Sequence, residues 1–190
     1  MEANIILQVF AAICAIAIIP VPVFWLSFHR NIKHFRRHPQ HAVCMMAALI
    51  ALVTLLVANN TTEFSVSFGT NIAGQAAGAA LIVFAVYLTW KISNIMDIKT
   101  TAGLQEIKNK KIFLKRGIYH SIRHPIYLSI FLFLAGFLLA TGLAAFMYLL
   151  IYTITMFTMV TIEEEKELVK RFGKEFILHK KNTGRFIPKF

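Results

Sequence analysis

Charged residues are scarce in this chain. Asp, Glu, Lys and Arg together make up 15% of the 190 residues, whereas about 25% is usual for a soluble globular domain. Hydrophobic residues make up 57%, and the mean hydropathy is +0.64. These values exclude an ordinary soluble domain and indicate an integral membrane protein. A chain of this length forms one compact bundle, so we expect a single membrane domain over residues 1–190.

Cysteine is also rare, and the usual nucleotide-binding glycine pattern is absent. The two cysteines, Cys14 and Cys44, fall at different depths of the apolar runs, so the sequence implies no disulfide framework. No Gly-x-Gly-x-x-Gly pattern occurs, and a Rossmann-type cofactor fold is therefore not supported.

Long uncharged apolar runs are what the chain does contain. About 20 helical residues, at 1.5 Å each, cross a hydrocarbon core of about 30 Å. On this basis we predict five transmembrane helices, at residues 4–28, 42–58, 71–90, 125–140 and 143–162. Because only Thr141 and Gly142 separate the last two runs, these runs should form a tight antiparallel hairpin. The predicted fold class is an all-α, multi-pass integral membrane protein with a C-terminal helical hairpin and a cytoplasmic tail helix.

The basic residues predict the orientation. All 20 Lys and Arg fall between the first and second runs, between the third and fourth, or after the fifth. The positive-inside rule therefore puts the N-terminus outside and the C-terminus in the cytoplasm. The net charge of +11 is attributed to this topology and to anionic lipid headgroups. We expect no nucleic-acid partner, because the basic residues abut the spans without an exposed aromatic platform.

Two further patterns receive structural interpretations. Gly74 and Gly78, together with Ala73 and Ala77, form a small-residue stripe that we assign to close helix packing. A run of histidines precedes Cys44, but Pro39 interrupts any helical register, so we expect headgroup contacts there and no metal. The histidines are His29, His34, His38 and His41. Ion-coupled transport is not favoured, because no apolar run carries a charge away from its ends.

One polar motif stands at the mouth of the predicted hairpin. The segment 123–127 reads Arg-His-Pro-Ile-Tyr, and the hairpin ends on the glutamates of segment 163–165. Antiparallel pairing places His124 within about a turn of Glu163 and Glu164. Pro125 suits the first turn of a helix, which leaves Arg123 and His124 at the positive end of the helix dipole. Such an end favours an anionic group, for instance a ligand carboxylate.

Helical phase separates the glutamates. If residues 162–176 continue as one helix at 100° per residue, four apolar side chains form an arc of about 100°. These are Leu168, Val169, Phe172 and Phe176. Glu165 falls at the centre of the arc and Glu164 near its edge, so both are candidates for a ligand role. Glu163 and Glu167 fall on the opposite side with Lys170 and Lys174, where i, i+4 pairing on a solvated face explains them.

The motifs together carry a family resemblance. Segment 117–127 reads Gly-x-Tyr-x-x-x-Arg-His-Pro-x-Tyr, segment 164–173 reads Glu-Glu-x-x-Leu-x-x-x-Phe-Gly, and segment 184–188 reads Gly-Arg-Phe-Ile-Pro. In this order the chain resembles the isoprenylcysteine carboxyl methyltransferase and phospholipid methyltransferase superfamily over roughly residues 104–190. The resemblance implies an S-adenosylmethionine-dependent methyltransferase with a membrane-embedded pocket open to the cytoplasm and a lipophilic or membrane-associated acceptor. By the same resemblance, the cofactor-binding residues are Lys111, Ile112, Phe113, Leu114, Tyr119, His124, Pro125, Ile126, Tyr127 and Glu164.

Departures from the family pattern bear on the acceptor. Family members often have a histidine where this chain has Lys111, and the prenylcysteine branch tends to place an arginine where this chain has Val160. A carboxylate acceptor is thus not favoured, and a lipid amine, a thiol or another lipid group stays open. No catalytic residue is assigned, because methyl transfer needs mainly alignment; the candidates are Glu165 and Arg123. The alternatives are an NADPH-dependent reductase of the sterol reductase type, whose C-terminal hairpin is similar, and a non-catalytic membrane protein.

Overall fold

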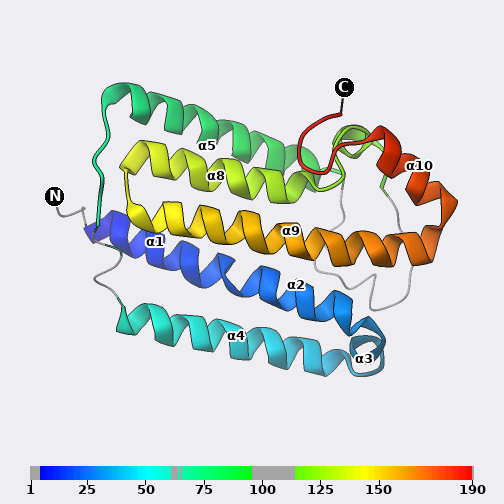
Figure 1. The fold of residues 1–190 in the computed structure, drawn as a ribbon. Helices are drawn as coiled ribbons and strands as arrows, with labels where there is room; N and C mark the ends of the chain where they lie inside the picture. The colour runs from blue at the N-terminus through cyan, green and yellow to red at the C-terminus, as the bar shows by residue number, and fades with distance from the viewer. Residues whose placement is uncertain (1–4, 61–63, 65, 96–113, 190) are drawn as a thin grey trace.

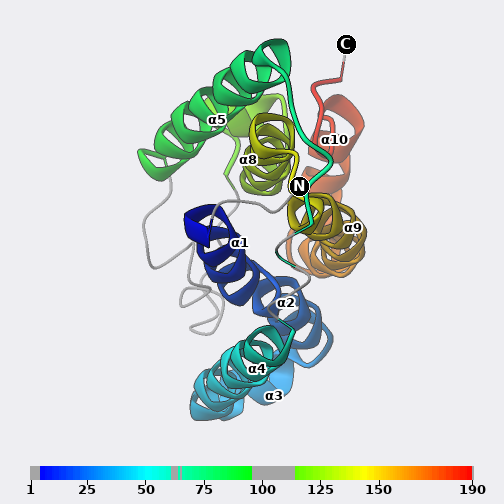
Figure 2. The same cartoon turned by 90° about the vertical axis from the view of Figure 1, so that its left-hand side faces the viewer.

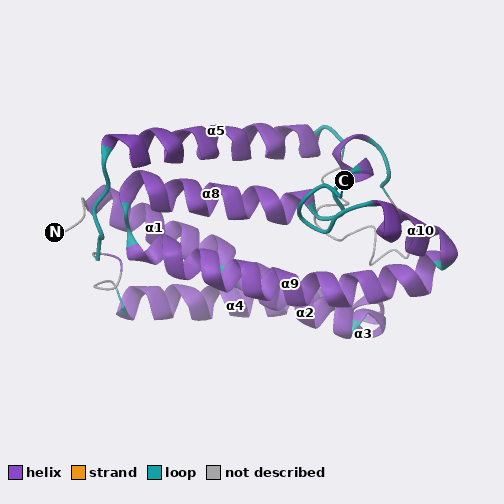
Figure 3. Cartoon of the chain, turned by 45° about the horizontal axis from the view of Figure 1, so that its top comes forward, coloured by secondary structure: helices purple, strands orange, loops and turns teal. Residues whose placement is uncertain are grey.

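The described part of the chain is a bundle of long, nearly parallel helices (Figure 1). The computed structural model describes residues 5–60, 64, 66–95 and 114–189. Within these residues the elements are α1 (Ile5–Ile18), α2 (Pro20–Arg30), α3 (Ile32–Arg37), α4 (Pro39–Asn59), α5 (Ile72–Ser93), the 3₁₀ helix η2 (Gly117–His120), α8 (Pro125–Thr141), α9 (Ala144–Phe172) and α10 (Lys174–Asn182). In the same residues all regular secondary structure is helical, and the loops between the helices contain only isolated β-bridges (Figure 3). The prediction of an all-α protein is confirmed.

Several helices are long enough to cross a bilayer. By length and composition, the described residues contain 4 candidate spans. They are Ile5–Arg30, Pro39–Asn59, Ile72–Ser93 and Ala144–Phe172. The remaining predicted run, 125–140, corresponds to α8, which is apolar but only 17 residues long. The first candidate span is broken where α1 ends and α2 begins at Pro20, because proline cannot donate the hydrogen bond that a helix interior requires.

Helix α9 is the central element of the bundle. It contacts α8, α2, α1 and α10, and the two views agree that α8 separates it from α5, whereas α2 separates it from α4 (Figures 1 and 2). One core cluster joins α1, α8 and α9 through buried side chains such as Ala11, Leu134 and Phe146. The Arg-His-Pro-Ile-Tyr motif and the glutamates of segment 163–165 are therefore carried by helices that packing holds along their length.

Close packing of α5 on α8 depends on glycine. A Cβ atom at Gly78 would lie 2.5 Å from both the Gly136 carbonyl oxygen and the Ala140 nitrogen, so only glycine allows this approach. The packing role predicted for Gly74 and Gly78 is thus confirmed. The role predicted for Ala73 and Ala77 is wrong, because both residues are exposed. They lie one residue, or 100°, around the helix from the glycine face.

A tight turn joins α8 to α9. Gly142 has φ 67°, and a Cβ atom there would lie 2.3 Å from the Gly69 oxygen. The turn is also held by the segment before α5, since the Phe68 nitrogen donates to the Gly142 oxygen at 2.8 Å and the Ala144 nitrogen to the Val66 oxygen at 3.0 Å. The two helices leave this turn side by side and in opposite directions (Figure 1).

The tail does not continue α9. The continuous helix over residues 162–176 that the phase argument assumed is interrupted, because α9 ends at Phe172 and Gly173 has φ 56°. At this left-handed backbone conformation the chain reverses, and α10 turns back toward the start of α8 (Figure 1). Phe176 is still buried, but it reaches the interior from α10.

Candidate functional site

The C-terminal tail lies directly against the loop before α8. The Arg123 nitrogen donates to the Gly184 oxygen at 2.9 Å, and the His124 nitrogen donates to the Arg185 oxygen at 3.0 Å. In return the Gly184 nitrogen donates to the Ser121 oxygen at 3.1 Å. Glycine is required in this tail turn, because a Cβ atom at position 184 would lie 1.5 Å from the Ile187 oxygen. The tail motif and the Arg-His-Pro-Ile-Tyr motif therefore form one structural unit.

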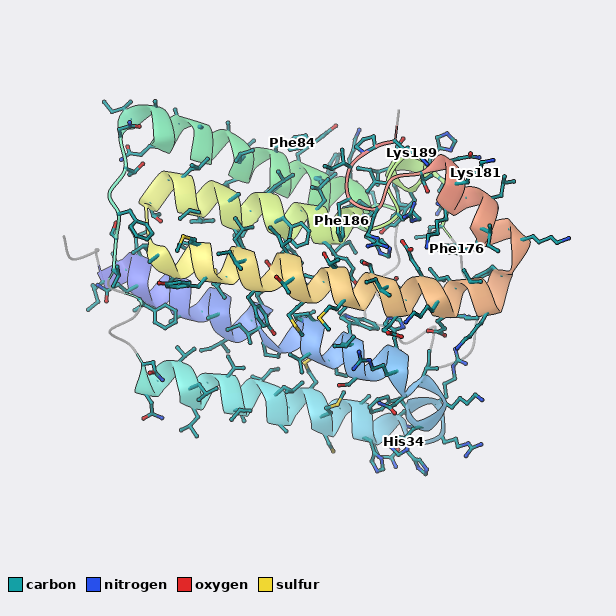
Figure 4. The ribbon with its side chains drawn as sticks, viewed as in Figure 1. His34, Phe84, Phe176, Lys181, Phe186 and Lys189 are labelled. Carbon is teal, nitrogen blue, oxygen red and sulfur yellow. The ribbon has the colours of Figure 1, made fainter. Side chains whose placement is uncertain are left out.

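A stack of rings orients the motif at the start of α8. Pro125 occupies the first turn, as predicted, and the buried His124 precedes it as the N-terminal flanking residue. The imidazole of His124 stacks on the Tyr127 ring at 5.6 Å and 7°, and that ring stacks on Phe157 of α9 at 4.3 Å and 19°. From the tail, the Phe186 ring lies 6.2 Å from His124 (Figure 4). These contacts hold His124 and Tyr127 in one orientation.

Glu165 is the centre of a buried ionic cluster. Its side chain is 2% exposed, and Arg123 Nε lies 2.9 Å from Oε1. Lys180 Nζ forms an ion pair with Oε2 at 2.7 Å, and Arg185 Nε lies 3.5 Å from Oε1. His124 Nε2 lies 3.4 Å from Oε1. We call this set of residues the Glu165 cluster. A carboxylate so deeply buried is stable only when such partners compensate its charge.

The catalytic candidates named from the sequence, Glu165 and Arg123, thus pair with each other. Arg123 also binds the tail, because its Nη1 donates to the Lys180 oxygen at 3.2 Å and contacts both oxygens of Thr183. This geometry favours a structural role for the pair, in which α9, the loop before α8 and the tail are joined.

Glu164 has a different environment from its neighbour. Its side chain is 23% exposed. Among the described residues, Tyr127 donates its hydroxyl to Glu164 Oε2 at 3.4 Å, and His124 Nδ1 lies 3.4 Å from the same oxygen. These distances exceed the usual range of about 2.7 to 3.2 Å for a hydrogen bond. The carboxylate therefore keeps the capacity to accept from a cationic ligand.

An apolar wall lies beside this carboxylate. Tyr119 is buried in a cluster with Leu88 and Ile92, against which Leu114 and Ile126 pack. Burial first, and then the negative charge of Glu164, raise the pKa of the Tyr119 hydroxyl. The Tyr119 hydroxyl therefore lies within electrostatic range of the Glu164 carboxylate. The other predicted cofactor residues, Lys111, Ile112 and Phe113, lie outside the described residues.

Positive charge gathers beside the site, where α10 lies near Arg123 and Lys115. Burial, and then the charges of Arg123, Lys115 and His120, lower the pKa of the His179 imidazole on α10. A positive field of this kind disfavours further protonation and favours a bound anion. Together with the N-terminus of α8, it suits a ligand that carries a carboxylate.

Glu163 and Glu167, which the sequence placed together on a solvated face of α9, have different surroundings. Glu163, which is half-buried, pairs at 3.0 Å with the exposed Lys166 three residues further on, so ordinary helix pairing accounts for it although the spacing is i, i+3. Glu167 does make an i, i+4 pair, with Arg171 at 3.5 Å, but the prediction of a solvated face is wrong, because it also pairs with His29 Nδ1 at 3.0 Å and with Arg36 Nη2 at 3.1 Å. The headgroup contact predicted for His29 is wrong for the same reason, since this residue is buried. Helical phase indicates which side of α9 a residue occupies, but not that α2 and α3 cover that side.

Sequence reasoning missed several residues of the site. Lys180 and Thr183 of the tail are partners of the Glu165 cluster, yet Lys180 is one of many basic residues after α9 and has no distinguishing signal. Arg185 belongs to the tail motif, but the pattern does not indicate its pairing with Glu165. Phe157 lies mid-helix, where an aromatic residue is ordinary.

Comparison with known families agrees with this geometry. The phospholipid methyltransferase family matches residues 73–175, which extend from α5 to the start of α10. The chain belongs to the phospholipid methyltransferase family. No curated protein matches the sequence at a significant level. Membership confirms the predicted superfamily and, with the long apolar helices, identifies a multi-pass membrane protein of a methyltransferase family.

The Glu165 cluster makes a stability prediction. Glu165→Gln should lower the thermal stability of the detergent-solubilised protein, since breaking a buried ion pair on one side costs about 3 to 5 kcal/mol. The freed tail should also be cleaved faster by trypsin at Lys180 and Lys181. Thermal unfolding and limited proteolysis measure both effects. Glu163→Gln, the matched control, breaks only a pair with the exposed Lys166 and should change stability by less than about 0.5 kcal/mol. Equal behaviour of the two variants would contradict the structural role of Glu165.

Proposed function

We propose that this protein is an S-adenosylmethionine-dependent methyltransferase that acts on a lipophilic or membrane-associated acceptor. The observation that carries the proposal is the pair of adjacent glutamates with different environments. Glu165 is enclosed by basic groups, whereas Glu164 makes long contacts beside the Tyr119 wall. The family match over residues 73–175 supports the same chemistry.

The residues present fit the parts of this cofactor. Its ammonium and sulfonium groups require an acidic partner, which Glu164 provides. Its carboxylate suits the N-terminus of α8 and the basic groups around it. Its adenosine suits an aromatic and apolar slot, for which Tyr119, Leu114 and Ile126 are available. With these we retain the other residues implied by the resemblance, namely Lys111, Ile112, Phe113, His124, Pro125 and Tyr127.

In the proposed reaction the protein binds the cofactor and aligns it with the acceptor. The bound cofactor supplies an electrophilic methyl group. Glu164 holds the cationic part of the cofactor, and the ring stack of His124, Tyr127 and Phe157 fixes the groups around it. Glu165 and Arg123 keep the tail closed against the motif and so limit the access of water. Alignment of this kind accounts for a large share of such a rate enhancement.

The proposed acceptor is a lipid with a neutral or weakly acidic nucleophile. Val160 is fully buried in α9, so its side chain offers no charge that would recognise a carboxylate. An apolar groove of about 410 Å³ lies between α1, α5 and α8, and Ser129, Ile130 and Phe133 line it one to two turns beyond Pro125. A groove of this composition suits a hydrocarbon chain.

We further propose five spans within a single membrane domain, with the N-terminus outside and the C-terminus in the cytoplasm. This count adds α8, whose 17 residues reach about 25 Å at 1.5 Å per residue. The basic residues that flank the spans set the direction. Reporter fusions should be active in the cytoplasm at the C-terminus and outside the cell at the N-terminus. Both termini on the same side would contradict the five-span arrangement.

Calorimetric titration distinguishes this function from the other candidates. The folded, purified protein should bind S-adenosylmethionine and S-adenosylhomocysteine but not NADPH. Binding of NADPH would instead favour the reductase hypothesis. If protein that is demonstrably folded binds none of these three ligands, the non-catalytic hypothesis is favoured and the proposal is rejected.

A single substitution tests the assigned pocket. Glu164→Gln removes the charge that would pair with the cofactor, and a hydrogen bond to a charged group contributes about 1.5 to 3 kcal/mol. The dissociation constant for S-adenosylhomocysteine should therefore rise roughly 10- to 100-fold. Glu163→Gln makes the same charge change one residue away and should leave the affinity unaltered. Unchanged affinity in Glu164→Gln would remove this residue from the pocket.

A further inference from the structure

A second ionic cluster lies on α9 one turn beyond Glu164, where α2 and α3 supply its partners. Glu167 Oε2 pairs with His29 Nδ1 at 3.0 Å, and Oε1 pairs with Arg36 Nη2 at 3.1 Å. Arg171, one turn further along α9, lies 3.5 Å from the same oxygen. We call these residues the Glu167 cluster. The Glu167 side chain is 12% exposed and that of His29 is 2% exposed, so solvent screens this cluster far less than an open surface pair.

The cluster is held firmly from the N-terminal side. The His29 ring stacks on Trp25 at 5.4 Å and 22° and meets the edge of Phe28 at 5.7 Å. His29 comes from the end of α2, whereas Arg36 comes from α3. The two helices meet at Asn31, whose backbone nitrogen donates to the Ser27 oxygen at 3.0 Å. Helices α2 and α3 therefore both contribute a side chain that pairs with one carboxylate of α9.

This contact joins two different parts of the chain. His29 and Arg36 precede residues 73–175, the portion that the family matches, whereas Glu167 and Arg171 lie within it. The N-terminal helices are thus attached, through buried charges, to the helix that carries Glu164.

The position of the cluster limits rotation of α9. Glu165 and Glu167 are two residues apart, which is about 200° around a helix. The Glu165 cluster therefore holds α9 from one side, and the Glu167 cluster holds it from nearly the opposite side. Side-chain ends lie about 6 Å from a helix axis, so a rotation of about 10° would move the Glu164 carboxylate by about 1 Å. A misplacement of about 1 Å can reduce the rate of a positioned reaction by about 100-fold.

We propose that Glu167, together with His29 and Arg36, is a positioning residue that sets the rotation of α9 and thereby presents Glu164 to the cofactor. This inference rests on the proposed function. Glu167 does not bind the cofactor itself, because both of its carboxylate oxygens are already paired with His29, Arg36 and Arg171. It acts through Glu164. Removal of the Glu167 charge should therefore weaken cofactor binding only in protein whose Glu164 can still pair with the cofactor.

A double-mutant cycle tests this coupling. S-adenosylhomocysteine is titrated into wild-type protein, Glu164→Gln, Glu167→Gln and the double variant. Glu167→Gln alone should raise the dissociation constant about tenfold, or about 1.4 kcal/mol. In the Glu164→Gln background the same substitution should change the dissociation constant less than about twofold, because residues that act through one another are not additive. A tenfold change in both backgrounds, or no change in either, would overturn the proposal.

Matched variants separate positioning from loss of fold. Glu163→Gln should have wild-type affinity, and Glu167→Asp, which keeps the charge, should recover part of the lost affinity. If Glu167→Gln does not fold by circular dichroism, Arg36→Gln replaces it, since this change leaves the His29–Glu167 pair in place. If Glu164→Gln binds too weakly to titrate, Glu164→Asp takes its place. Wild-type protein that binds no S-adenosylhomocysteine rejects the proposed function, whereas binding with an additive cycle rejects only the positioning role.

Discussion

The structure depends on one buried carboxylate among basic groups. Glu165 pairs with Arg123 beside the motif, and with Lys180 and Arg185 of the tail. A carboxylate that is 2% exposed would be unstable without these partners, and the partners would repel one another without the carboxylate. This mutual requirement brings α9, the loop before α8 and the tail to one place, although they are far apart in the sequence.

Successive glutamates of α9 consequently have different tasks. Glu165 joins the tail to the Arg-His-Pro-Ile-Tyr motif, and Glu167 joins α9 to α2 and α3 through His29 and Arg36. Glu164 lies between these two directions, with long contacts and partial exposure. A helix that is fixed from two sides can hold a carboxylate at a set position without enclosing it. This is the property that a binding site for a cationic cofactor needs.

Much of this arrangement could be predicted from local features of the sequence. Pro125 begins α8 because its missing N–H is not needed in a first turn, and helical phase correctly separated the buried Glu165 from Glu163, which pairs with an exposed lysine. Long-range features could not be predicted. The reversal at Gly173 depends on its positive φ. The sequence does not show which glycines adopt a positive φ. The burial of Glu167 depends on α2 and α3, which are more than a hundred residues away along the chain.

The central claim is that this membrane protein transfers a methyl group from S-adenosylmethionine to a lipophilic acceptor. The most direct measurement is transfer of labelled methyl by the purified, reconstituted protein to prenylcysteine, phosphatidylethanolamine, small thiols and a total lipid extract from its own membranes. The account predicts label in a lipid product, with little or none in the prenylcysteine ester. Protein that binds the cofactor but labels none of these acceptors would contradict it.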